Sequence, residues 1–205
     1  MASLVFPHYV GISTINSPPQ GQWTAADWEA LPDDEYRYEI IDGELYMSKS
    51  PSYFHQWILL NLYDLVGRPA RQQGLAFPAL APIGVFMPGT TPVQPDFVLV
   101  MAQHSAIIHD RGIQGVPDLI VEVLSPGSRD YDEDVKLKAY ARAGVPEYGV
   151  IDPELRQLRL YQHPATDHYP APSVFKEAEQ CSFRCLPGIT FPLSALFEGS
   201  PDTTL

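Results

Sequence analysis

The feature that most constrains this chain is an apolar stretch interrupted by a single acid, which reads LIVEVL at residues 119–124. A near-continuous apolar run is typical of a strand that is buried on both faces. Strand alternation places Ile120, Glu122 and Leu124 on the same face, so the carboxylate points where apolar neighbours point. An ionised carboxylate is costly there unless it is paired or binds a metal ion. Glu122 is therefore a structural acid with a partner, an acid near a solvent-exposed strand end, or part of a functional site.

A second acid, Asp96, stands directly before another apolar segment, FVLV at residues 97–100. The preceding residue is Pro95, which restricts the backbone and can hold the acid rigidly at the start of a strand. Pro-Asp pairs are also common in ordinary turns, and this alternative stays open for Asp96 taken alone.

The third candidate is Lys136, on a helix that the sequence predicts over residues 128–143. It shares a face with Asp132 and Tyr140 at four-residue spacings, so the base of its side chain can point inward. A solvated lysine paired with Asp132 or Glu133 is the alternative for this residue alone.

Considered together, Asp96, Glu122 and Lys136 indicate one kind of chemistry. Two carboxylates near adjacent strands can hold a hard divalent cation through oxygen atoms and leave waters in place, as Mg²⁺ prefers. Such a cation acts as a Lewis acid and lowers the pKa of a bound water. A lysine nearby can orient that water or stabilise charge on a phosphate group. These are the requirements of phosphodiester hydrolysis.

The order of the predicted elements indicates the fold class. Turn and cap signals predict a helix from Thr24, a hairpin at Asp42-Gly43, a helix from about Ser50 that ends at Gly67, strands between Gly74 and Val100, the strand at residues 118–124, a helix from Ser128 to Gly144, and a strand pair around Asp152-Pro153. The order α-β-β-α-β-β-β-α-β-β predicts an α/β (mixed α+β) chain in which helices flank a mixed sheet. We expect an N-terminal arm at residues 1–22, one domain at 23–198 and a C-terminal tail at 199–205.

The charge of the chain argues against a generic nucleic-acid binder. Its formal net charge is −12 at pH 7, whereas non-specific binding to nucleic acid relies on positive charge that meets phosphate. A nuclease of this composition would have to rely on a local basic strip, on metal ions or on an oligomer.

Several other classes of protein are disfavoured. The chain holds no long apolar run, and its N-terminus lacks the pattern of a signal peptide, so we expect a soluble, cytoplasmic protein without membrane contact. The six histidines form no HExxH pattern. The two cysteines, Cys181 and Cys185, are too few for a zinc or disulfide framework, and we expect reduced thiols.

Three segments carry a resemblance to a known family: YRYEIIDGEL at residues 36–45, VQPDFVLV at 93–100 and PDLIVEVLSPGSRDYDEDVKLKAYARAGVPEYGVIDP at 117–153. They resemble the Uma-two family of bacterial restriction-type endonucleases, which belongs to the PD-(D/E)XK nuclease superfamily. The resemblance covers roughly residues 23–195. It implies a restriction-endonuclease-like core, Mg²⁺ or Mn²⁺ as the cofactor, and DNA as the substrate.

The resemblance also implies roles for individual residues. Asp96 matches the acid of the PD motif, and Glu122 matches the acid of the (D/E)XK motif. Leu124 stands where the standard motif has its lysine, and the family relocates that lysine to the following helix in a K-L-x-x-Y-A pattern. Lys136 matches the lysine of this pattern and inherits the role, and Tyr140 is its tyrosine.

Other residues are secondary candidates. The carbonyl of Val123 could be an additional metal ligand. Glu39 resembles an extra acid found near such sites, and His55 matches a position that is often polar in the family. Surface or hairpin positions without a role are the alternative for both. Gln94 and Arg129 could contact phosphate or water.

The leading hypothesis from the sequence is a metal-dependent endodeoxyribonuclease. We expect a homodimer, because cutting both strands of a duplex is simplest with two sites related by a two-fold axis. A rival hypothesis is a nuclease fold kept as a non-catalytic binding or assembly module, which the net charge and the broken (D/E)XK motif, with Leu124 in place of its lysine, favour. A third, a nuclease acting on RNA or branched DNA, shares the site and differs only in its substrate.

Overall fold

The computed structural model of the protein describes residues 17–201, except for residues 33, 35, 49, 89 and 126–128. Most of the expected N-terminal arm, and the N-cap expected at Ser128, lie outside the described residues. The helical segments are α1 (Ala25–Glu29), α2 (Tyr53–Leu62), η1 (Tyr63–Gly67), α3 (Arg68–Gln72), η2 (Ala102–Ile107), η3 (Tyr131–Lys136), α4 (Leu137–Ala143) and η4 (Leu193–Leu196). The strands are β1 (Arg37–Ile41), β2 (Glu44–Ser48), β3 (Ala76–Leu80), β4 (Val85–Met87), β5 (Thr90–Val93), β6 (Phe97–Met101), β7 (Ile108–His109), β8 (Gly112–Gln114), β9 (Leu119–Val123), β10 (Glu147–Asp152), β11 (Gln157–Gln162), β12 (Ser173–Lys176), β13 (Gln180–Ser182) and β14 (Thr190–Pro192).

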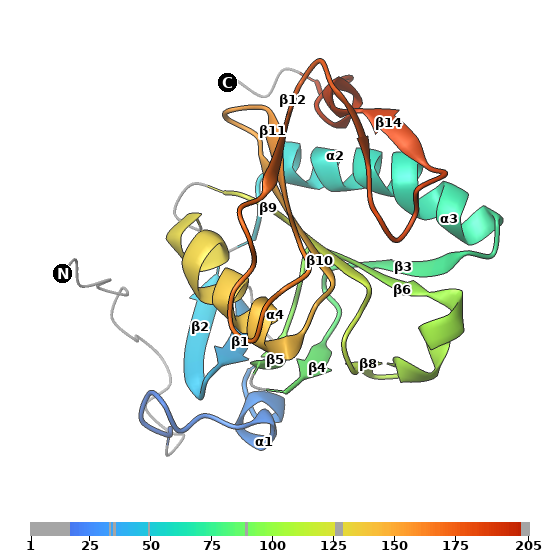
Figure 1. The fold of residues 1–205 in the computed structure, drawn as a ribbon. Coiled ribbons are helices and arrows are strands. Elements are labelled where there is room, and N and C mark those ends of the chain that lie inside the picture. Colours follow the sequence, from blue (N-terminus) through green and yellow to red (C-terminus); the bar gives the residue numbers. More distant parts are fainter. Residues whose placement is uncertain are drawn as a thin grey trace.

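A six-stranded mixed sheet forms the centre of the fold, with the strand order β12-β11-β10-β9-β6-β3 (Figure 1). Strands β9 and β10 are parallel, and the other neighbouring pairs are antiparallel. A parallel pair needs a long crossover connection, and here the helical segment η3–α4 supplies it. The mixed sheet flanked by helices is thus confirmed. The crossover also carries the predicted lysine helix back over the strand that holds Glu122.

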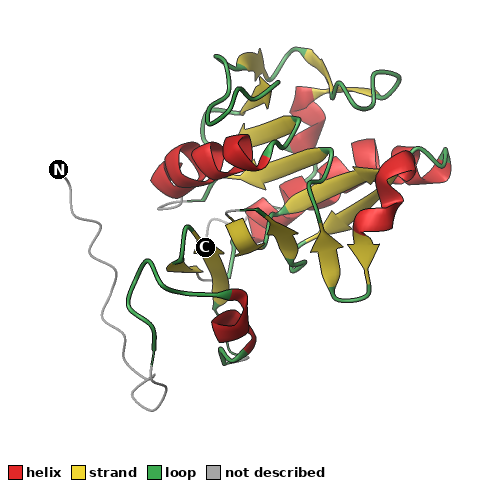
Figure 2. Cartoon of the chain, turned by 60° about the horizontal axis from the view of Figure 1, so that its bottom comes forward, coloured by secondary structure: helices red, strands yellow, loops and turns green. Residues whose placement is uncertain are grey.

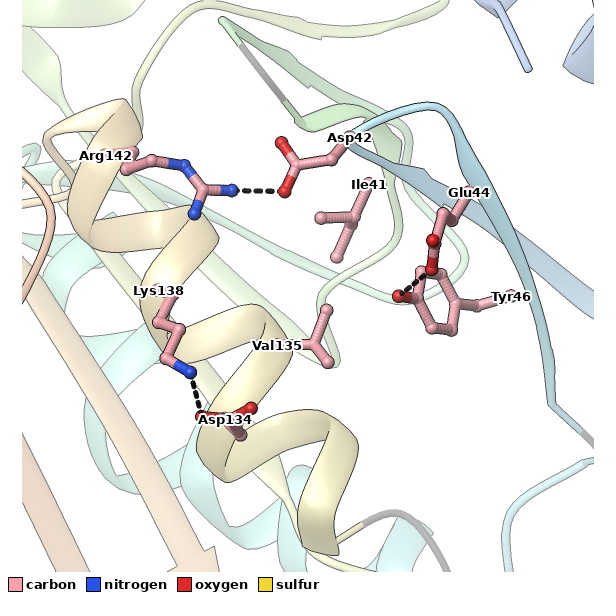
Figure 3. A pocket seen from close by; sticks show the side chains of 8 residues that line it. All are labelled: Ile41, Asp42, Glu44, Tyr46, Asp134, Val135, Lys138 and Arg142. Atoms are coloured by element: carbon pink, nitrogen blue, oxygen red, sulfur yellow. Dashed lines mark hydrogen bonds and ion pairs between the residues drawn. The ribbon is translucent and has the colours of Figure 1, made fainter. Parts of the chain in front are cut away.

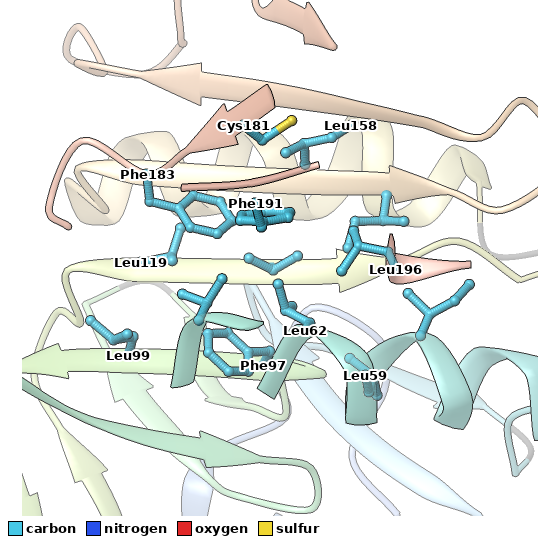
Figure 4. Close-up of a cluster of buried hydrophobic side chains, with 14 of the residues drawn as sticks. Leu59, Leu62, Phe97, Leu99, Leu119, Leu158, Cys181, Phe183, Phe191 and Leu196 are labelled. Atoms are coloured by element: carbon cyan, nitrogen blue, oxygen red, sulfur yellow. The ribbon is translucent and has the colours of Figure 1, made fainter. Parts of the chain in front are cut away.

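One face of the sheet is buried beneath α2, η1, α3 and the tail strands β13 and β14 (Figures 1 and 4). Leu119, Val121 and Val123 of β9 all point into this core. Leu62 of α2 and Phe191 of β14 are buried against them. Burying each large apolar side chain stabilises the fold by about 1.5–3 kcal/mol, so this face anchors the sheet.

The opposite face is covered by α4 and by a second sheet with the order β5-β4-β8-β7. Ile120, the second residue of β9, and Leu124, just beyond its end, point into this second core, where Tyr140 and Val150 also pack. Glu122 lies between Ile120 and Leu124 on the same face, as strand alternation predicts, and it is buried. The acid is therefore enclosed by apolar side chains, and it needs partners.

The hairpin β1–β2 stands at the margin of the fold together with α1 (Figure 2). It turns at Asp42 and Gly43, as predicted, and their φ angles of 53° and 76° are the left-handed values of a two-residue type I′ turn. The indole of Trp28 in α1 donates a hydrogen bond to the Tyr38 carbonyl at 2.8 Å. This bond ties the short helix to the hairpin.

The second helix differs from the prediction at both ends. It begins after Ser52 rather than Ser50, and it continues past Gly67 to the end of α3. Gly67 has an ordinary helical φ of −64°. A Cβ at this position would lie 2.9 Å from the Tyr63 ring and 3.1 Å from Pro78, so the glycine permits close packing and does not end the helix. Within the described residues, no helix has both the length and the apolar character needed to cross a membrane.

Both cysteines are free thiols, as expected, with Cys181 buried and Cys185 half-buried. Burial, together with the charge of Glu179, raises the pKa of Cys181 to about 12. Burial also raises the pKa of Cys185, and the charges of Glu147 and Asp118 add to the effect. Because only the thiolate is nucleophilic, we expect alkylation at pH 8 to be at least about 100-fold slower in the folded protein than in the urea-unfolded chain. Mass spectrometry after timed iodoacetamide labelling measures both rates, and equal rates would contradict this placement of the thiols.

Candidate active site

Asp96 and Glu122 are neighbours on adjacent antiparallel strands. Strands β6 and β9 pair through Phe97 and Val121, so one further step of the register sets the two acids opposite each other. The Val123 N–H donates to Asp96 Oδ2 at 3.0 Å, and the Asp96 N–H donates to Glu122 Oε2 at 3.2 Å. Each carboxylate thus reaches the main chain of the other strand. From standard bond lengths, the two carboxylates lie within about 8 Å of each other.

Lys136 and Tyr140 reach Glu122 from the crossover helix. The Lys136 amine lies 2.9 Å from Glu122 Oε1, and the Tyr140 hydroxyl donates to the same oxygen at 3.0 Å. Asp132, one turn earlier, places its Oδ1 3.6 Å from the amine. The lysine side chain is 3% exposed, so its amine faces the acids and not the solvent. The structure therefore brings together Asp96, Glu122 and Lys136, the three main candidates from the sequence.

A further acid enters from the hairpin. Glu39 of β1 places Oε2 3.2 Å from the Lys136 amine, and its Oε1 accepts a hydrogen bond from the Gln94 N–H at 2.8 Å. Tyr131, in the π-helical turn η3, donates to Glu39 Oε2 at 3.3 Å, and its ring centroid lies 5.1 Å from the amine. Tyr46 packs on Tyr131 with the centroids 4.5 Å apart. Four buried acids thus form an acidic cluster: Glu39, Asp96, Glu122 and Asp132.

Two further side chains contact Asp96. Arg37 of β1 donates from Nη1 to Asp96 Oδ1 at 2.9 Å and to the Gln94 carbonyl at 3.4 Å. His55 of α2 is buried, with Nε2 3.3 Å from Asp96 Oδ2, an ion-pair distance without the alignment of a hydrogen bond. Sequence reasoning missed Arg37 and the tyrosine of η3. Strand alternation could have found Arg37, because it shares a face of β1 with Glu39.

Gln94 and Arg129 have other contacts. The side-chain amide of Gln94 donates to the Tyr38 carbonyl at 3.3 Å, which ties its loop to β1. Arg129 Nη1 lies 2.8 Å from Asp152 and 3.5 Å from Glu133. These contacts hold Arg129 to acids at the end of β10 and at η3. Among the described contacts, none joins Arg129 to a carboxylate of the acidic cluster.

Comparison with known proteins assigns the family. The family model of Uma-two, described as "Putative restriction endonuclease", matches residues 25–194. The chain belongs to the Uma-two family. A solved structure described as "a putative nuclease belonging to DUF820", from Anabaena variabilis ATCC 29413, has a similar fold, with a TM-score of 0.72 and 18% sequence identity over 85% of this chain and 97% of that chain. No curated protein sequence matches the chain.

The two central acids of this Uma-two protein differ in how readily they hold a proton. Burial would raise the pKa of Asp96, but His55 and the charge of Arg37 lower it below its usual range. Burial raises the pKa of Glu122 well above its usual range, because the attraction of Lys136 does not offset it and the other acids add to it. Burial would lower the pKa of Lys136, but the acids raise it, so the amine keeps its charge. Of the two acids, Glu122 is thus the one that holds a proton more readily.

The donors present fit a Mg²⁺ or Mn²⁺ ion that takes few protein ligands. In the part of the chain that the structure describes, no three or more histidine, cysteine, aspartate or glutamate side chains are arranged as a ready-made metal site. Mg²⁺ commonly takes one or two carboxylates and completes its shell with waters and substrate phosphate, so the adjacent pair Asp96 and Glu122 suffices.

A surface pocket of about 240 Å³ lies between the hairpin β1–β2 and the helix η3–α4 (Figure 3). Charged pairs line it, with Arg142 2.6 Å from Asp42 and Lys138 2.5 Å from Asp134. Tyr46 also lines it, and the same ring packs on the tyrosine of η3. The acidic cluster contributes no residue to this pocket. The pocket is therefore a neighbour of the candidate site and not the site itself.

Proposed function

We propose that this Uma-two protein is a divalent-cation-dependent endonuclease that hydrolyses phosphodiester bonds in DNA. One observation carries the proposal: Asp96 and Glu122 face each other across neighbouring strands, and the buried amine of Lys136 lies 2.9 Å from Glu122. Paired carboxylates beside a charged amine suit hydrolysis assisted by a hard cation. Membership of a family described as restriction endonucleases supports the same reaction class.

In this proposal Asp96 and Glu122 would hold the cation, and the Val123 carbonyl would be a further ligand. When bound, Mg²⁺ or Mn²⁺ supplies Lewis acidity toward the phosphate group and the attacking water. Lys136 keeps its proton and, together with the Tyr140 hydroxyl, donates to Glu122 Oε1. These two bonds hold the carboxylate in one orientation, with Oε2 beside the Asp96 N–H. A site ordered in advance needs no reorganisation when the reaction begins.

The relocated lysine supports the proposal. Leu124 occupies the position of the motif lysine, and it packs in the apolar core beside Ile120. Lys136 delivers its amine to Glu122 from the helix instead. Since stabilisation depends on where the charge lies in space, an amine from another element can serve the same purpose.

Dependence on metal tests the proposal. With purified protein and supercoiled plasmid, we expect nicked or linear DNA in the presence of Mg²⁺ or Mn²⁺ and intact plasmid after addition of EDTA. Parallel reactions with RNA and branched DNA distinguish the substrate classes. Light scattering of the same sample measures whether the proposed homodimer forms. Cleavage that persists in EDTA, or no cleavage of any substrate in either metal, would contradict the proposal.

A second candidate is a nuclease fold that binds or assembles without cutting. The net charge of −12 favours it. So does the pairing within the protein, because each oxygen of Asp96 and Glu122 already accepts at least one hydrogen bond. Calorimetry discriminates between the two candidates. No heat on titration with Mn²⁺, together with no DNA binding at low salt, would favour the module.

A further inference from the structure

Arg37 holds a carboxylate oxygen that a metal ion at Asp96 would need. Its Nη1 donates to Asp96 Oδ1 at 2.9 Å, while Oδ2 accepts the main-chain N–H of Val123 at 3.0 Å. The main-chain donor belongs to a central strand and cannot withdraw without disrupting the sheet. An arginine side chain can move to another rotamer. Of these two hydrogen-bond donors to Asp96, Arg37 is therefore the one that can move away.

Arg37 is also less deeply buried than Lys136. The Arg37 side chain is 20% exposed, compared with 3% for Lys136. Within the described residues, the hydrogen bonds of Arg37 all start from Nη1, which leaves Nη2 and Nε available. An arginine that presents two donors matches the oxygens of a phosphate group in a forked arrangement. An incoming phosphate would thus meet Arg37 before it meets the buried lysine.

A divalent cation and the guanidinium repel each other if both contact Asp96, so each disfavours the binding of the other. A phosphate group beside the cation removes this conflict, because it gives the displaced guanidinium an anionic partner. We propose that Arg37 pairs with Asp96 in the cation-free protein. When the cation binds to Asp96, the guanidinium leaves this carboxylate and pairs with the substrate phosphate. This inference rests on the proposed function. It makes the binding of cation and of nucleic acid mutually reinforcing.

Manganese affinity tests the first half of the inference. Mn²⁺ is titrated by calorimetry into the wild-type protein, Arg37→Met, Arg37→Lys and the control Arg142→Met, which removes a partly exposed cation that pairs with Asp42. We expect Arg37→Met to bind Mn²⁺ about 10-fold more tightly than the wild type. Arg37→Lys keeps the charge, and Arg142→Met removes a charge elsewhere. Both should bind Mn²⁺ with an affinity within about two-fold of the wild-type value. Thermal unfolding in EDTA verifies that each variant is folded, and Arg37→Gln replaces Arg37→Met if that variant is not.

Cleavage kinetics test the second half. At saturating Mn²⁺, we expect Arg37→Met to raise the KM for DNA about 10-fold with a much smaller change in kcat, and Arg37→Lys to restore most of the loss. Mn²⁺ affinity that is unchanged or weaker in Arg37→Met, while the wild type binds, would overturn the inference and leave the proposed function standing. An unchanged KM would overturn the release to phosphate. Failure of the wild type and all variants to bind Mn²⁺ would overturn both the inference and the proposed function.

Discussion

Replacing Glu122 by glutamine is expected to lower the cleavage rate by on the order of 10³-fold or more. The substitution keeps the shape of the side chain and removes the charge that would hold a cation. A glutamine carbonyl can still accept hydrogen bonds from Lys136 and Tyr140, which contact Glu122 Oε1 at 2.9 and 3.0 Å. The packing of the core should therefore survive, and the lost rate would report on the chemistry. Asp96→Asn is expected to reduce the rate to a similar degree.

Asp134→Asn is the matched control for these two variants. Asp134 belongs to the same helical turn as Lys136, but its side chain is 62% exposed and pairs with Lys138 at the surface. We expect this control to cut plasmid within two-fold of the wild-type rate. Initial rates at saturating Mn²⁺ and thermal unfolding in EDTA are the measurements. Wild-type rates from both Glu122→Gln and Asp96→Asn would remove the acid pair from the mechanism.

Lys136→Met is expected to lower the free energy of unfolding by about 3–5 kcal/mol at pH 7 without divalent cations. The amine is buried, 2.9 Å from Glu122 and 3.2 Å from Glu39, so its removal leaves buried acids without their cation. Methionine keeps an unbranched side chain of similar length, so the loss reports mainly on charge. Urea unfolding followed by tryptophan fluorescence measures the difference.

Lys138→Met provides the comparison, because Lys138 is 59% exposed and its ion pair with Asp134 lies at the surface. A surface pair contributes about 0–1 kcal/mol, so this variant should unfold almost as the wild type does. Addition of Mn²⁺ should stabilise Lys136→Met more than the wild type, because a bound cation supplies charge that the variant lacks. If Lys136→Met lowers the free energy of unfolding by less than about 1 kcal/mol, the neighbouring acids are neutral in the variant. This account of the cluster would then be wrong.

The site is acidic, as is the chain as a whole. Carboxylates outnumber the cations around Asp96 and Glu122, and the net charge of the chain is −12. Phosphate binding therefore cannot rely on a broad positive surface. In the proposed function, a bound cation and Arg37 attract the substrate phosphate, and this attraction acts only over a short distance. A strong loss of cleavage at raised salt is a property of broad basic surfaces, and the proposal does not require it.

The main candidates were predictable from local patterns in the sequence. Period-two alternation set Glu122 on the same face as Ile120, and the structure confirms that placement. Four-residue spacing aligned Lys136 with Asp132 and Tyr140, and all three are buried on one side of the crossover helix. The prediction that Gly67 ends a helix was wrong. A glycine commonly ends a helix by adopting a left-handed backbone, as Gly144 does with φ 82°, whereas Gly67 keeps a helical φ of −64°. The local sequence did not show that Gly67 serves packing instead.

The sequence by itself determined which residues share a face of each strand or helix, because alternation, helical spacing and turn chemistry act over a few neighbouring positions. Only the tertiary structure decided that Arg37 and Glu39 of the hairpin, and His55 of α2, meet Asp96 and Lys136. These contacts join segments that lie far apart along the chain. They depend on strand order and on how the hairpin packs beside β5 and the crossover helix, which no local period encodes. The physical reason is that a buried charge pairs with the opposite charges that the fold places next to it. Long-range packing determines which groups those are.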